Sequence, residues 1–180
     1  MEISKKGILE IAQYEGASQT CYLDSVGVKT VGIGLTISDI SDINLWPWSK
    51  MITLEQVFDM YTLSLQKYVD DVNLHVKSPL EQYQFDALCS VAYNIGSYGE
   101  DHSTFLKDIN NKASTDEIVK AIKMWNKPKE IIGRRNKEAN LFAKGIYSNN
   151  GMVDLIYVDP ITHKEIPSKA REIDATKYVQ

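Results

Sequence analysis

The chain has 180 residues, of which 43% are hydrophobic and 24% charged, and its 20 Lys and Arg against 24 Asp and Glu leave a net charge of −4. This composition is that of a globular protein, and it excludes collagen-like, low-complexity and wholly disordered chains. The sequence pI of about 5.4 argues against nucleic acid as a partner, because duplex binders usually carry a basic face. A membrane span needs about 18 consecutive apolar residues, and no run in the sequence reaches that length.

The first helix is predicted over residues 4–15, with Ser4 as its N-cap. The acidic, periodic character of this segment is not that of a signal peptide, so we expect the chain to be made in a cytosol. Ile8 and Ile11 lie on the buried face of the helix, and Glu15 falls on the same face at its end. A carboxylate there is unusual, because Glu is rarely buried unless it is paired or functional.

Residues 17–52 predict a small β-containing lobe. Two short strands, at 21–24 and 29–34, flank a tight turn. Gly32 and Gly34 alternate within the second strand, which indicates close approach of another backbone or a ligand. Trp46 and Trp48 follow in an irregular segment, where a packed loop is favoured and stacking on sugar rings is the other interpretation.

A helical region is predicted from residue 53 to residue 145. The signals that begin its helices are Thr53 with Gln56, Ser78 with Pro79 and Glu81, Ser103, and Ser114 with Glu117. The helix after Ser114 points Trp125 inward, Pro128 ends it, and a final helix ends at Gly145. Residues 146–180 form a C-terminal extension with a possible hairpin that packs on the body.

Glu15, Asp24 and Thr30 suit glycoside hydrolysis, because a helix end facing a hairpin makes the wall of a cleft. Hydrolysis of a glycosidic bond needs one protonated carboxyl group and one ionised carboxylate. Partial burial raises the pKa of a Glu, whereas a solvated loop keeps an Asp ionised, and a Thr hydroxyl can orient a water. Spacing alone is weak evidence, since surface carboxylates at this separation are common.

The segment from Tyr14 to Thr36 resembles the catalytic segment of phage-type lysozymes, glycoside hydrolase family 24. Eight residues separate Glu15 from Asp24, and five separate Asp24 from Thr30. Three later blocks match in order: 84–96 resembles the central buried helix of the family, 103–110 the next helix, and 132–142 its Gly-Arg-Arg-x-x-Glu helix. The resemblance covers about residues 5–145.

The resemblance implies an α+β, mainly helical, lysozyme-like fold of two lobes in a catalytic domain over residues 1–145. The small β lobe comprises 17–52, and the larger helical lobe comprises 53–145 with the helix at 4–15. The implied activity is that of a muramidase, which cleaves the β-1,4 bond between N-acetylmuramic acid and N-acetylglucosamine with inversion. Glu15 is then the general acid, Asp24 activates the attacking water, and Thr30 helps to place it.

Further expectations concern ligands. By resemblance, Gly34, Tyr93 and Asn94 line the sugar cleft. Arg134 closes on Glu15, or instead Arg134 and Arg135 only pair with Glu138 on a helix surface. No metal or organic cofactor is expected, and the scattered histidines, His75, His102 and His163, lack the spacing of metal ligands. The expected partner is the glycan strand of peptidoglycan, bound by a monomer without stable insertion into a membrane.

The resemblance also implies a biological setting, that of a phage or prophage endolysin. It would accumulate in the host bacterial cytoplasm and reach the wall after release through a holin. The extension at 146–180 leaves open the same activity in a secreted toxin or a tail-associated lysozyme. A protein of this fold that binds a glycan or partner without cutting is disfavoured, because all three catalytic positions are filled. Cys21 is expected as a small buried side chain, with a redox lock near the site as the other interpretation.

Overall fold

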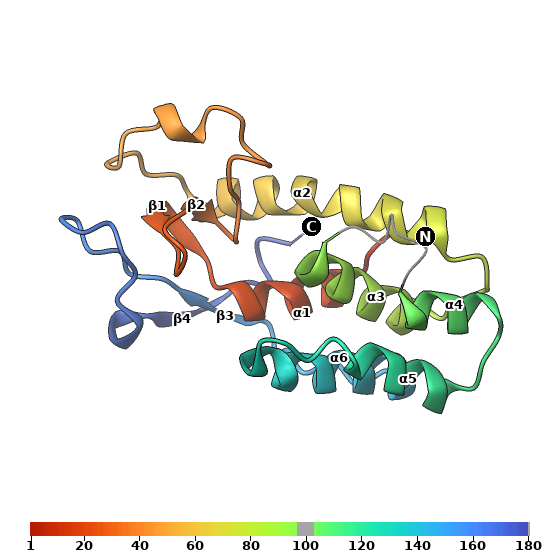
Figure 1. Cartoon of the computed structure of the whole chain (residues 1–180). Helices are drawn as coiled ribbons and strands as arrows, with labels where there is room; N and C mark the ends of the chain where they lie inside the picture. Colours follow the sequence, from red (N-terminus) through yellow and green to blue (C-terminus); the bar gives the residue numbers. More distant parts are fainter. Residues whose placement is uncertain (97–102, 180) are drawn as a thin grey trace. The chain divides into compact units, whose positions relative to one another are not determined.

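The computed structural model describes residues 1–96 and 103–179. Figure 1 shows the order of its elements along the chain. The α-helices are α1 (Lys5–Glu15), α2 (Leu54–His75), α3 (Gln82–Ile95), α4 (Thr104–Asn110), α5 (Thr115–Lys123) and α6 (Ile132–Lys144). The strands are β1 (Ser18–Leu23), β2 (Lys29–Gly32), β3 (Met152–Leu155) and β4 (Arg171–Asp174), and short 3-10 turns lie at Ile43–Leu45, Lys129–Ile131 and Pro167–Lys169.

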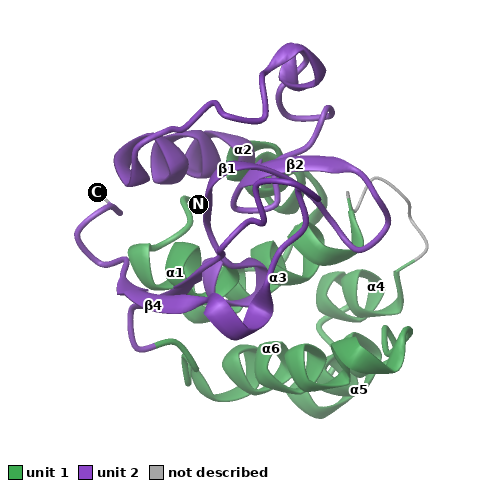
Figure 2. Cartoon of the chain, turned by 90° about the vertical axis from the view of Figure 1, so that its left-hand side faces the viewer, with its two compact units in different colours: residues 1–11, 65–149 green, residues 12–64, 150–180 purple. Residues whose placement is uncertain are grey.

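The chain divides into two compact units, which Figure 2 distinguishes by colour. Unit 1 comprises residues 1–11 and 65–149, and unit 2 comprises residues 12–64 and 150–180. Unit 1 contains α3 to α6, and unit 2 contains both pairs of strands. The predicted α+β, mainly helical fold with a small hairpin after the first helix is confirmed. Within the part of the chain that the structure describes, no helix has the length and apolar character needed to cross a bilayer.

In unit 1, α3 packs on α6, and α5 packs on both α4 and α6. The middle of α3 is buried over the whole run from Phe85 to Ala92, which includes the polar Asp86 and Ser90. Buried polar groups need partners, because an unpaired one costs about 1–3 kcal/mol. Asp86 accepts hydrogen bonds from the Ser4 backbone N–H at 3.0 Å and from the Tyr147 hydroxyl at 2.6 Å. These bonds connect α3 to the residue just before α1 and to the segment that follows α6.

Most helix boundaries follow the predicted caps. Ser103 Oγ accepts from the Leu106 N–H at 3.2 Å, Ser114 and Glu117 form a capping box, and Gly145 ends α6 in the left-handed conformation. The predicted start of α3 was wrong, because Glu81 is the N-cap and Ser78 lies outside the helix. The Ser78 hydroxyl instead donates to the Ile109 carbonyl at 2.7 Å, so that it is engaged by a distant segment.

Trp125 also differs from the prediction. The α5 helix ends at Lys123, and the Trp125 side chain is 42% exposed. The Trp125 N–H donates to the Ile122 carbonyl at 3.3 Å, a tighter closure than that of an α-helix. The side chain therefore leaves the inward-facing row that helical spacing predicted.

In unit 2, β1 and β2 form an antiparallel hairpin in which Tyr22 lies opposite Thr30. The second strand ends at Gly32, so the prediction that Gly34 lies within it was wrong. Val31 and Leu35 exchange two backbone hydrogen bonds, at 2.9 and 3.0 Å, across a tight turn. Gly32 and Gly34 have φ of +65° and +72° in this turn, and such values favour glycine because it has no Cβ.

The C-terminal residues are an integral part of unit 2. Strands β3 and β4 pair in antiparallel fashion, and the Ala17 N–H donates to the Asp154 carbonyl at 2.7 Å just before β1 begins. Val179 is 5% exposed, and the Tyr178 ring stacks on Phe58 with centroids 5.4 Å apart. The extension therefore contributes apolar side chains to the interior of unit 2.

Candidate active site

The three residues predicted to carry the chemistry all belong to unit 2. Glu15 is the last residue of α1 and is half-buried, Asp24 follows β1, and Thr30 lies in β2. After Glu15, the Gly16 N–H donates to the Ala12 carbonyl at 3.1 Å and φ of +68° turns the chain into β1. The helix end and the hairpin are thus joined by a short, hydrogen-bonded turn.

Asp24 fixes the turn of the hairpin through one carboxylate oxygen. Its Oδ1 accepts hydrogen bonds from the backbone N–H groups of Val26 at 3.0 Å and Val28 at 2.8 Å. The Asp24 N–H also donates to the Val28 carbonyl at 3.0 Å. These bonds hold the carboxylate in one orientation, with Oδ1 engaged by the turn.

Thr30 lies on the second strand of the hairpin, six residues after Asp24, and is only 3% exposed. Its hydroxyl donates to the Val28 carbonyl at 3.1 Å. Since a hydroxyl has one hydrogen and two lone pairs, this bond uses the hydrogen and leaves the oxygen able to accept. Thr30 Oγ1 can therefore hold a donor such as water.

The hydroxyl of the buried Tyr22 is affected by the charges of both Glu15 and Asp24. Burial raises the pKa of the Tyr22 hydroxyl, and the negative charges of Glu165, Glu15 and Asp24 raise that pKa further. Such an effect requires that all three carboxylates lie within electrostatic range of one phenol. The end of α1 and the turn of the hairpin therefore present Glu15 and Asp24 to a common region of unit 2.

Sequence reasoning did not single out Tyr22 or Glu165. The register of the hairpin, which places Tyr22 opposite Thr30, is the signal that could have found the tyrosine. Glu165 comes from the C-terminal extension, in a segment where Val158 and Glu165 form a β-bridge. No local pattern links such a residue to β1.

Comparisons with known proteins identify the family. A sequence model of the phage lysozyme family matches residues 12–138. The endolysin of Salmonella phage P22 is 34% identical over 145 residues, which are 79% of this chain and 98% of that protein. The chain belongs to the phage lysozyme family. It is accordingly a glycosidase of the lysozyme type, a phage endolysin that hydrolyses peptidoglycan.

Solved structures give the same result for the fold of this lysozyme. The endolysin from Escherichia coli O157:H7 phage FAHEc1 superposes with a TM-score of 0.73 at 29% identity, over 83% of this chain and 98% of that one. The muramidase domain of SpmX from Asticaccaulis excentricus superposes with a TM-score of 0.67, also at 29% identity, over 78% of this chain and 97% of that one. The predicted lysozyme-like fold is confirmed.

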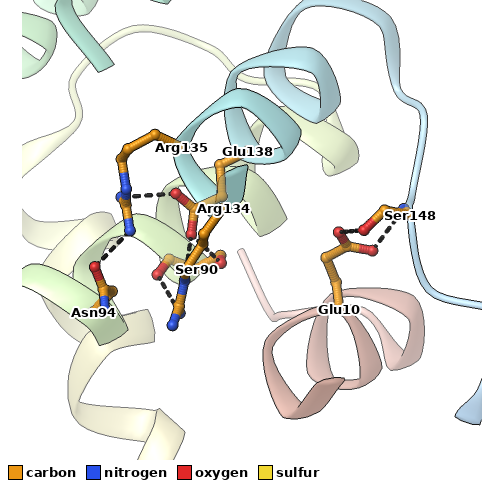
Figure 3. A network of polar contacts seen from close by, with 7 residues as sticks. All are labelled: Glu10, Ser90, Asn94, Arg134, Arg135, Glu138 and Ser148. Carbon is orange, nitrogen blue, oxygen red and sulfur yellow. Dashed lines mark hydrogen bonds and ion pairs between the residues drawn. The ribbon is translucent and has the colours of Figure 1, made fainter. Parts of the chain in front are cut away.

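The other residues predicted for the lysozyme cleft lie in both units. Gly34 is in the Val31–Leu35 turn of unit 2, whereas Tyr93, Asn94 and Arg134 are in unit 1. The Tyr93 ring packs edge-on against Tyr68 at a centroid distance of 5.1 Å. The exposed Asn94 accepts a hydrogen bond from the Arg135 guanidinium at 2.6 Å (Figure 3).

Arg134 and Arg135 converge on one buried carboxylate, as Figure 3 shows. Arg134 Nε lies 2.9 Å from Glu138 Oε1, and Arg135 NH1 lies 2.7 Å from Oε2. Arg135 and Glu138 are 1% and 0% exposed, so this is an interior ion cluster and not the surface pair that helical spacing suggested. Burial raises the pKa of Glu138, while the two arginines and the Ser90 hydroxyl, 2.6 Å from Oε1, act in the opposite direction.

The remaining sequence candidates are aromatic residues, cysteines and histidines. Trp48 stacks on His163 with centroids 4.2 Å apart and an interplanar angle of 4°, as a packed loop predicts. Cys21 and Cys89 are both buried and free, and burial raises the pKa of the Cys21 thiol. Over residues 1–96 and 103–179, no group of three or more His, Cys, Asp or Glu is placed to hold a metal ion, and His102 lies outside these ranges.

Proposed function

We propose that this endolysin hydrolyses the β-1,4 bond between N-acetylmuramic acid and N-acetylglucosamine, with Glu15 as the general acid. The observation that supports this assignment is that Glu15 and Asp24 act on the same buried Tyr22 hydroxyl and carry the family spacing to Thr30. A glycosidase of two carboxylates needs both groups at one bond, one on each side of the sugar.

Asp24 and Thr30 would activate and place the attacking water. Because the Val26 and Val28 N–H groups occupy Asp24 Oδ1, the other oxygen, Oδ2, is the one that accepts the proton of the water. Thr30 Oγ1, whose hydrogen is given to the Val28 carbonyl, accepts the second hydrogen of the same water. The water then attacks the anomeric carbon, Glu15 gives its proton to the leaving oxygen, and the configuration is inverted.

Substitution of the carboxyl groups tests these roles. Glu15→Gln should lower the rate of peptidoglycan hydrolysis on the order of 10²–10⁴-fold, because a positioned acid contributes about that factor. Glu165→Gln is the matched control, since it removes a carboxylate that also acts on Tyr22 but lies beyond the family match at residue 138. Wild type and Glu165→Gln should clear chloroform-treated Gram-negative cells at similar rates. Undiminished clearing by Glu15→Gln would show that the acid is misassigned.

The products test the stereochemistry and the class of reaction. An inverting hydrolase releases the α-anomer of reducing muramic acid, which proton NMR distinguishes during the first turnovers. Anhydromuramic ends in a mass spectrum would instead identify a transglycosylase. Initial formation of the β-anomer would require Asp24 to act as a nucleophile.

The substrate-binding residues and the cellular route of the enzyme follow from the same assignment. From the family resemblance we further propose that Gly34, Tyr93 and Asn94 contact the sugars, that Arg134 orients Glu15, and that residues 1–145 are a catalytic domain that acts as a monomer. The enzyme accumulates in the host cytoplasm and reaches the wall after a holin opens the inner membrane. The endolysin relatives support this setting over a secreted toxin or a tail lysozyme. A holin gene beside the coding sequence would be expected, whereas a neighbouring immunity gene would favour the toxin.

A further inference from the structure

A groove of about 450 Å³ lies in unit 2 beside β1. One side is formed by Gln19, Thr20 and Met51, and the other by residues 155–158 together with Lys169 and Arg171. The second side lies beyond residue 138, where the match to the phage lysozyme family ends. The volume is in the range of pockets that bind small ligands or a short stretch of peptide. The groove is therefore a feature that the C-terminal extension adds to this lysozyme.

The charged side chains that line the groove are positive. Lys169 and Arg171 are its charged lining residues, and no carboxylate is found among the described residues that line it. The alternation of side chains along a strand keeps the nearby carboxylates off the groove. Arg171 pairs with Leu155 on the groove side, whereas Glu172 pairs with Asp154 on the opposite face of the two strands. The Lys169 ammonium lies 4.7 Å from the centroid of the Tyr157 ring, which supports its position over the groove.

We propose that this groove binds the acidic peptide stem of peptidoglycan, an inference that rests on the proposed function. The stem is a short peptide attached to muramic acid, and it combines free carboxylates with small apolar side chains. The two cations complement the carboxylates, and Met51, Ile156 and Tyr157 offer apolar contacts to the side chains.

The reach of the stem agrees with the position of the groove. Thr20, in β1, precedes Asp24 by four residues of extended chain, which corresponds to about 13 Å at about 3.3 Å per residue. An extended peptide of about five residues spans up to about 17 Å. A stem attached to a sugar at Asp24 is therefore long enough to enter the groove.

Two substrates separate this role from catalysis: intact peptidoglycan, and the same glycan after an amidase has removed its stems. For Lys169→Ala/Arg171→Ala, KM on intact peptidoglycan should rise about tenfold at unchanged kcat, because two charge-assisted contacts are lost. On stem-free glycan the variant should equal wild type. Lys120→Ala/Lys123→Ala, which removes two exposed charges from α5, is the matched control and should equal wild type on both substrates.

A free stem pentapeptide, titrated by calorimetry, reports on the groove without any cleavage. Wild type and the α5 control should bind it, and the groove variant should bind it about tenfold more weakly. The proposal would be overturned if all three proteins bound the pentapeptide equally. It would also be overturned if the groove variant lost as much activity on stem-free glycan as on intact peptidoglycan. If wild type cleaves neither glycan, the proposed function fails, while the titration still decides whether the groove binds the stem.

Discussion

The substitution Gly7→Ala distinguishes the helix propensity of α1 from its packing in unit 1. Gly7 lies in the first turns of α1, where alanine is favoured over glycine by up to about 1 kcal/mol. A Cβ at this position would lie 2.6 Å from Asp86 Cγ and 2.9 Å from Asp86 Oδ1. Ordinary carbon contacts are about 3.5–4.0 Å, so one side chain or the helix must move by about 1 Å.

The magnitude follows from what holds Asp86 in place. This carboxylate is 1% exposed and accepts hydrogen bonds from Ser4, from Gln82 Nε2 at 2.9 Å and from the Tyr147 hydroxyl at 2.6 Å. Overpacking of a buried site costs about 1–3 kcal/mol, and the displaced hydrogen bonds add to that cost. After the gain in helix propensity is subtracted, we expect Gly7→Ala to lower the free energy of unfolding by about 2 kcal/mol. For a protein of this size, that loss corresponds to a decrease in Tm of about 4–8 °C.

Gly133→Ala is the matched control, because Gly133 also lies in a helix, α6, but an added Cβ there meets no atom within 4 Å. This variant should be as stable as wild type or more stable, by up to about 1 kcal/mol. Urea unfolding followed by circular dichroism gives both midpoints on the same scale. If Gly7→Ala is stabilised as much as Gly133→Ala, the contact between α1 and Asp86 does not constrain the helix and the reasoning is refuted.

Two further predictions concern buried and exposed carboxylates. Glu138→Gln should lower the free energy of unfolding by about 3–5 kcal/mol in urea titrations, because it leaves the buried Arg135 without its counter-charge, and a loss below about 1 kcal/mol would contradict the interior ion cluster. The N–H groups of Thr162 and Ile161 and the Thr162 hydroxyl lower the pKa of Asp159 below its ordinary 3.8. Asp159 therefore stabilises the fold above pH 3.8 and loses that effect as the pH falls through its lowered pKa, so Asp159→Asn should flatten the acid limb of Tm against pH. An unchanged acid limb would show that these bonds also persist in the unfolded chain.

Features that depend on neighbours in the sequence were predicted well. Ser4 accepts from the Gly7 N–H at 3.0 Å, and Ser114 and Glu117 bond each other, so both caps close within a few residues. Ser78 shows where such reasoning fails. Its residue type and the following proline are right for a cap, yet its hydroxyl bonds the Ile109 carbonyl, which no local pattern indicates.

The candidate site divides in the same way. Glu15, Asp24 and Thr30 lie on one short stretch of chain, so their spacing and the family resemblance were sufficient to propose them. The contributions of the C-terminal extension were not predictable. The His163 carbonyl accepts from the Leu23 N–H at 2.6 Å beside Asp24, and Glu165 acts on Tyr22, through pairings between residues far apart in sequence.

By itself, the sequence determined the family, the order of the helices and the identity of the candidate catalytic groups, because capping, periodicity and motif spacing are local properties. Only the tertiary structure decided that Arg135 and Glu138 pair in the interior, that three carboxylates lie within electrostatic range of Tyr22, and that two cations of the extension share a groove with β1. The physical reason is that burial and electrostatic range depend on distance in space. Chain segments remote in sequence set that distance when they pack together.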